Sequence, residues 1–131
     1  MLFRSAALVI DFGIDTHVSE TCESSCVTVF LGGSKRTMSK GARIGFHQLS
    51  WNAASVEDYY NKHRGRRGWD TSFDFAEWMY QDTQTETYNR LTYMVRRGVN
   101  AEFAIQTLRR PDTSMWFPYR SVLKAAGVLT E

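Results

Sequence analysis

The sequence predicts an α/β fold with a helical C-terminal half. Short β-branched or alternating segments occupy the first 46 residues, whereas a long pattern with helical periodicity fills residues 73–97. The length of 131 residues, with 43% hydrophobic and 23% charged residues, is typical of one globular domain. We therefore expect a single domain over residues 1–131.

The chain opens with a predicted helix. Residues 2–12 carry several apolar side chains, and Gly13 ends the helix as a C-cap. A short strand is expected at residues 15–18. The polar segment 19–25 contains turn formers, so we expect a turn there.

Residues 26–31 form an apolar run whose type is ambiguous from sequence. Valine and threonine are β-branched and favour a strand. The serine pair before the run and the glycine pair after it are typical of helix ends. We predict a helix that begins at Ser24 and ends near Gly32.

Two short strands and a loop are expected next. The strands lie at residues 35–39 and 43–46, on either side of a turn at 40–41. The polar stretch 48–70, which includes the basic cluster 62–67, is predicted as a loop.

Three helices are expected in the C-terminal half. The polar residues 71–72 can cap a long helix over residues 73–97. Asn100 caps a shorter helix, which Pro111 prevents from continuing. A last helix is expected over residues 118–126, with proline in its first turn.

Composition narrows the function classes. The net charge of +2 is too small and too evenly spread to favour nucleic-acid binding. Two cysteines are too few for a disulfide framework, and no apolar run approaches the ~20 residues of a membrane span. The N-terminal residues do not resemble a signal peptide, so the chain by itself is expected in the cytoplasm. We expect no cofactor and no metal ion.

The densest set of candidate catalytic residues is the segment 21–26, followed about twenty residues later by the segment 43–48. A serine at a helix start lies near free backbone N–H groups, which favour a developing oxyanion. A histidine at a strand end is held firmly and can accept the serine proton. A carboxylate would orient the imidazole.

These residues resemble the ClpP/crotonase-like fold, and most closely its bacterial ClpP-like proteins, which are often periplasmic or membrane-anchored. The features that carry the resemblance are a C-x-S-x-C segment, an apolar helix that ends in small residues, and a basic hairpin with G-x-R-I-G-F-H. They correspond here to residues 22–26, 30–33 and 41–47. Residues 111–113 and 123–129 resemble the acidic turn and closing helix of the family.

The resemblance implies a serine peptidase site and a peptide or protein substrate. By position, Ser24 is the nucleophile, His47 the general base and Asp112 the orienting acid. The backbone N–H of Ser25 is one oxyanion donor. Because Met1 falls inside the first helix, the preceding strand and glycine turn of the family are missing, so we expect a partial ββα superhelix with an incomplete oxyanion hole.

Structural roles also fit the same side chains. Ser24 is an ordinary helix N-cap residue, and His47 can simply be satisfied at a strand end. Cys22 and Cys26 are compatible with a disulfide, with a metal pair that includes His17, or with plain packing.

The basic and aromatic segments also have two interpretations each. Residues 62–67, with nearby aromatic rings, could follow a phosphate backbone, but a solvated loop is the simpler interpretation. The aromatic residues of 73–80 favour core packing or a homo-oligomer contact through the helical half over a cofactor site.

The sequence therefore favours a serine hydrolase of the ClpP-like type, which acts through an acyl-enzyme. The alternative is a catalytically silent ClpP-like module for assembly or binding. A nucleic-acid-binding protein is the third and weakest hypothesis. The resemblance also implies a periplasmic or membrane-anchored location, against the cytoplasmic one expected from the chain alone.

Overall fold

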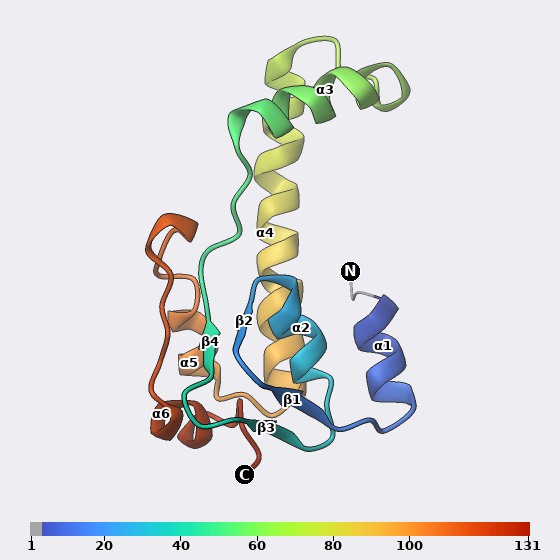
Figure 1. Ribbon diagram of the computed structural model, residues 1–131. Coiled ribbons are helices and arrows are strands. Elements are labelled where there is room, and N and C mark those ends of the chain that lie inside the picture. Colours follow the sequence, from blue (N-terminus) through green and yellow to red (C-terminus); the bar gives the residue numbers. More distant parts are fainter. Residues whose placement is uncertain (1–3) are drawn as a thin grey trace.

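The computed structural model describes residues 4–131 as a mixed α/β structure with a long helical arm (Figure 1). The first half combines two helices with four three-residue strands. These elements are α1 (Arg4–Asp11), β1 (Thr16–Val18), β2 (Thr21–Glu23), α2 (Ser25–Leu31), β3 (Arg36–Met38) and β4 (Arg43–Gly45). The second half is helical, with α3 (Ala53–Arg67), α4 (Ser72–Arg96), α5 (Ala101–Gln106), the 3-10 turn η1 (Asp112–Ser114) and α6 (Arg120–Ala125).

The ambiguous apolar run after Ser25 is helical, as predicted from its flanking serines and glycines. Val27, Phe30 and Leu31 are the buried residues of α2. Burial on one helical face outweighs the strand preference of the β-branched residues. The expected turn at 19–25 is wrong in part, because residues 21–23 form β2.

The strands pair in parallel and not as a hairpin. β1 pairs with β3 and β2 pairs with β4, so both connections pass through α2. The basic hairpin expected around residues 40–41 is therefore wrong: β3 and β4 are consecutive in sequence but belong to different pairs. In the register of β2 and β4, buried Cys22 lies opposite buried Ile44.

The loop predicted over residues 48–70 is also wrong, because most of it forms α3. The side chain of Asn52 caps this helix by accepting a hydrogen bond from the Ser55 amide, and Gly68 ends it at φ 71°. None of the residues of α3 is buried. A helix without a buried face lacks the apolar periodicity by which helices are recognised.

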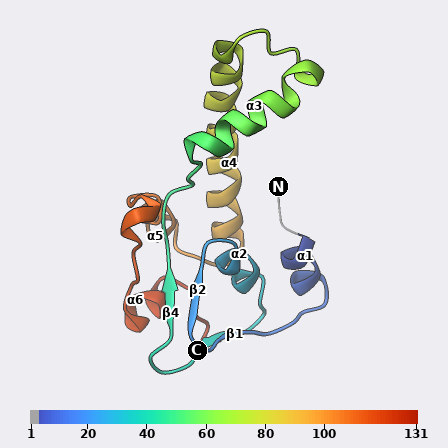
Figure 2. The same ribbon diagram turned by 45° about the horizontal axis from the view of Figure 1, so that its top comes forward.

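Helix α4 starts and ends within one residue of the prediction. Thr71 and Asp74 form a reciprocal capping box at its start. At 25 residues the helix is about 37 Å long. Its N-terminal half meets α3 far from the strands (Figures 1 and 2), whereas its C-terminal half packs beside α2 and α5.

Aromatic rings join α3 to α4 at the end of the arm. Tyr59 stacks on Trp78, with ring planes 9° apart and centroids 5.7 Å apart. The guanidinium of Arg67 lies over the rings of Trp69 and Trp78. Within the predicted aromatic set, Phe75 is buried as expected but Phe73 is 82% exposed.

The cap predicted for α5 is confirmed, whereas the proline predicted in the first turn of α6 lies before that helix. The Asn100 side chain accepts a hydrogen bond from the Phe103 amide at the start of α5. Helix α6 begins at Arg120, two residues later than expected, because Tyr119 is extended. The segment before α6 lies against β4 through an antiparallel bridge between Phe46 and Trp116.

Arg36 is 5% exposed and joins the ends of α2 and α4 to the segment after α6. All five N–H donors of its guanidinium reach backbone carbonyls. Two of these carbonyls, Leu31 and Gly33, end α2, and that of Arg97 ends α4. The remaining two belong to residues 127–128, in the segment after α6.

We predict that Arg36→Met lowers the free energy of unfolding by about 3–5 kcal/mol, because it leaves several buried carbonyl groups without hydrogen-bond donors. Urea denaturation measures this change. The matched control is Arg109→Met, at an exposed arginine, which should shift the value by less than about 0.5 kcal/mol. Equal losses in the two variants would contradict the role of Arg36.

Candidate functional site

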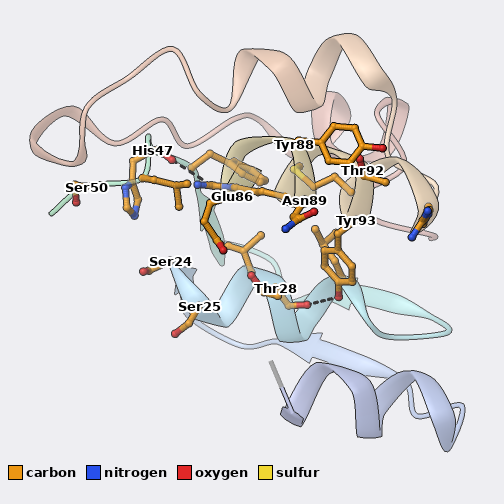
Figure 3. A pocket seen from close by; sticks show the side chains of 17 residues that line it. Ser24, Ser25, Thr28, His47, Ser50, Glu86, Tyr88, Asn89, Thr92 and Tyr93 are labelled. Atoms are coloured by element: carbon orange, nitrogen blue, oxygen red, sulfur yellow. Dashed lines mark hydrogen bonds between the residues drawn. The ribbon is translucent and has the colours of Figure 1, made fainter. Parts of the chain in front are cut away.

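A cavity of about 650 Å³ lies between α2 and α4, bounded also by the segment after β4. Ser24 and Ser25 line it at the start of α2, and His47 lines it just beyond β4. Figure 3 shows Ser24 and His47 toward the same end of the cavity, with Tyr93 toward the other. The structure thus brings two of the predicted catalytic residues to one cavity.

Ser24 occupies the turn between β2 and α2 with φ 58° and ψ −129°. Among residues 4–131 it is the only non-glycine residue with a positive φ. This region is natural for glycine and strained for residues with a side chain. Positive φ values in non-glycine residues are concentrated at functional sites.

The hydroxyl group of Ser24 does not act as a helix cap. Ser24 has the N-cap position of α2, yet its side chain makes no capping hydrogen bond. By contrast, Asn52, Thr71 and Asn100 all cap their helices through side-chain oxygens. The structural alternative for Ser24 therefore lacks its defining contact.

Cys22 and Cys26 are joined by a disulfide on either side of this turn, with their Cα atoms 5.4 Å apart. A bridge that closes so short a loop stabilises a protein by about 2 kcal/mol. A residue in a sparsely populated φ/ψ region costs about 1–3 kcal/mol. The two energies are similar, so the bridge can offset the strain of the serine that it encloses.

The metal alternative for these cysteines has no geometric support. His17, the expected third ligand, directs Nδ1 to the Thr37 hydroxyl at 2.7 Å and Nε2 to the Ser39 hydroxyl at 2.8 Å. In the part of the chain that the structure covers, no three His, Cys, Asp or Glu side chains are grouped to hold a metal ion.

His47 is half-buried, and two polar contacts fix it. Its Nδ1 lies 2.5 Å from the carbonyl oxygen of Gln48. Since a carbonyl only accepts hydrogen bonds, Nδ1 is the donor, and in the neutral imidazole Nε2 is then the nitrogen with the lone pair. The backbone carbonyl of His47 accepts a hydrogen bond from Arg90 Nη2 at 3.1 Å. His47 thus has the tautomer that a general base at Nε2 requires.

Asp112 is not brought to the imidazole. It starts η1, and its carboxylate accepts a hydrogen bond from the Ser50 hydroxyl at 3.1 Å. The Gln48 carbonyl has the place at Nδ1 that was expected for this carboxylate. The expected contact of Asp112 with His47 is therefore not formed. Ser24 and His47 are likewise not hydrogen-bonded to each other in residues 4–131.

The wall of the cavity opposite Ser24 comes from α4 and was missed by sequence reasoning. Glu86, Arg90 and Tyr93 line it from one helical face, at spacings of four and three residues. Tyr93 donates a hydrogen bond to the Thr28 carbonyl at 2.6 Å and so ties α4 to α2. This spacing of polar side chains within a long helix is the signal that could have identified the wall.

Burial shifts the pKa values of two groups on this wall. It raises the pKa of Tyr93, which keeps the phenol protonated as a donor, although the nearby Arg97 and Arg36 oppose the shift. It lowers the pKa of Arg90, whose guanidinium remains charged because its intrinsic pKa is so high. The wall of the cavity therefore contains a half-buried cation, Arg90, beside the backbone of His47.

A second contact between serine and histidine lies outside the cavity. The bond between His17 Nε2 and Ser39 Oγ joins β1 to the end of β3, and His17 is exposed. Neither side chain lines the cavity that contains Ser24. Ser39 is therefore a useful internal control for reagents directed at serine.

Comparisons with family models, curated proteins and solved structures found no match to this chain. No helix within residues 4–131 has the length and apolar character needed to cross a membrane.

We predict that Ser24→Gly raises the free energy of unfolding by about 0.5–1 kcal/mol, because glycine adopts the observed φ without strain. The matched control is Ser25→Gly, one residue later in the first turn of α2, which should lower it by about 0.5 kcal/mol. Urea denaturation of the oxidised proteins measures both. A loss of stability in Ser24→Gly would show that the backbone of Ser24 is not strained.

Proposed function

We propose that the chain is a serine hydrolase of the ClpP-like type that cleaves peptides, with Ser24 as nucleophile and His47 as general base. The observation that carries the proposal is the backbone of Ser24, which turns sharply from β2 into α2 at φ 58°. The Ser24 hydroxyl makes no capping hydrogen bond to the helix. In α/β-hydrolases, a strained turn from strand to helix exposes the nucleophilic serine for attack. The cavity shared with His47 gives the substrate a place beside it.

The proposed chemistry begins with proton transfer from Ser24 to Nε2 of His47. The serine oxygen then attacks the substrate carbonyl, and the negative charge develops on the former carbonyl oxygen. The amide of Ser25, the first residue of α2, has no partner within the helix and can donate to this oxygen. The imidazolium next protonates the leaving amine, and water hydrolyses the acyl-enzyme.

We assign the orienting role to the Gln48 carbonyl in place of Asp112. The carbonyl holds the same tautomer as a carboxylate would, since it accepts from Nδ1. It is neutral and stabilises the imidazolium less, so we expect a slow enzyme. Ser24 and His47 also have to approach each other when substrate binds, because catalytic hydrogen bonds are often long before binding.

The ClpP/crotonase-like superhelix, in partial form, is the finer fold assignment within this proposal. Two parallel strand pairs connected through α2 support it. The disulfide supports an oxidising compartment such as the periplasm. Exposed Phe73, Tyr80 and Tyr88 on α4 support a homo-oligomer contact through the helical half. Arg64 and Arg67 face aromatic rings of the same arm, which argues against nucleic-acid binding.

The second candidate function is a catalytically silent ClpP-like module for assembly or binding. It is favoured by the missing hydrogen bond between Ser24 and His47 in residues 4–131.

We predict that a fluorophosphonate probe labels the wild-type chain at Ser24. Ser24→Ala should abolish this label, and His47→Gln should slow it about 100-fold or more, because the general base is removed. Asp112→Asn should remain within about threefold of wild type, because the Asp112 carboxylate contacts Ser50 and not the imidazole. Mass spectrometry of the labelled peptide measures each rate.

Two serine variants are the controls for this experiment. Ser25→Ala keeps the backbone amide, and Ser39→Ala removes the serine that is bonded to His17. Both should label at the wild-type rate. A wild-type chain that stays unlabelled, or labelling at Ser24 that does not depend on His47, would refute the hydrolase and favour the silent module.

A further inference from the structure

The disulfide beside Ser24 is open to solvent on one side. Cys26 is exposed, whereas Cys22 is 1% exposed. Both line a second cavity of about 330 Å³, whose wall includes His17 and Glu20. Neither cysteine lines the cavity that contains Ser24. A small thiol can therefore reach Cys26 without entering the substrate cavity.

The disulfide closes a loop of three residues, and the strained Ser24 is the middle one. Only Glu23, Ser24 and Ser25 lie between the two cysteines. Cys22 is anchored in β2 opposite Ile44, and Cys26 belongs to the first turn of α2. The bridge thus joins the strand and the helix on either side of the turn, and Ser24 is the residue whose backbone absorbs the sharp change of direction.

We propose that the bridge between Cys22 and Cys26 is an exchange site for a dithiol reductant, and that its redox state sets the backbone conformation and reactivity of Ser24. This inference rests on the proposed function, since it assigns a regulator to the same nucleophile. The oxidised chain is the reactive form. In the reduced chain, the turn relaxes toward an ordinary conformation and the Ser24 hydroxyl leaves its position beside the cavity.

The exchange proceeds in two steps that balance. A thiolate of the dithiol attacks the Sγ of Cys26, the exposed cysteine, and forms a mixed disulfide, while the Sγ of buried Cys22 leaves as a thiolate. The second thiol of the reductant then attacks the reductant sulfur that is bonded to Cys26, and the Cys26 thiolate is released. Two electrons pass from the dithiol to the bridge, two protons complete the two cysteine thiols, and the reductant ends as a cyclic disulfide.

The chain is simple to test because it contains two cysteines and both are in the bridge. The rate of fluorophosphonate labelling at Ser24 is measured in oxidised protein, in protein reduced with dithiothreitol, and after reoxidation. The matched control is the double variant Cys22→Ser, Cys26→Ser, which has no bridge in any buffer. Circular dichroism checks that the overall fold is kept, and amide hydrogen exchange follows residues 21–27.

We expect reduction to slow labelling about tenfold or more, to speed amide exchange in residues 21–27, and to leave exchange in α4 unchanged. Reoxidation should restore the labelling rate. The double variant should resemble the reduced protein in both buffers.

Equal labelling rates and equal exchange in oxidised and reduced protein would overturn the inference and leave the proposed hydrolase intact. Absence of labelling in both states, with faster exchange on reduction, would refute the hydrolase and the control of reactivity, and would retain only the control of conformation. Loss of the fold in the reduced protein and in the double variant would overturn the inference, because the bridge would then be purely structural.

Discussion

The buried guanidinium of Arg36 determines how the two walls of the cavity that contains Ser24 meet. A cation that is 5% exposed without compensating contacts would be very costly. Here its five donors are distributed over the end of α2, the end of α4 and residues 127–128. Arg97 adds bonds from α4 to the Leu31 and Gly32 carbonyls. Because α2 and α4 form opposite walls of the cavity, its width depends on this cluster of carbonyl groups.

The arm, which consists of α3 and the N-terminal half of α4, and the body, which consists of the remaining elements, are stabilised by different interactions. In the body, aliphatic side chains such as Leu31, Ile44 and Leu123 are fully enclosed, and area removed from water supplies the main stabilisation. In the arm, α3 has no buried residue and is held by stacked rings and arginines above them. α4 belongs to both regions, which explains why only Phe75 and Met94 of its 25 residues are buried.

Helix ends marked by residues close in sequence were predicted correctly, whereas strand pairing between distant residues was not. Helix α4 followed from its capping residues, and α2 followed from serines and glycines within a few positions. The pairing of β3 with β1 could not be predicted, since a turn at residues 40–41 suggests a hairpin. Helix α3 carries no apolar stripe. At the candidate site, the resemblance paired Ser24 with His47, and both line one cavity. The Gln48 carbonyl contact depends on backbone geometry that no side-chain pattern encodes.

The bridge between Phe46 and Trp116 has a consequence for the order in which the site is assembled during synthesis. The turn around Ser24 is closed by residues four positions apart, so it can form as soon as that stretch has emerged. His47 lies between two backbone tethers to much later residues, from Phe46 to Trp116 and from Gln48 to Arg110. Contacts of such large sequence separation form late in folding. A nascent chain therefore closes the turn around Ser24 well before His47 is in position.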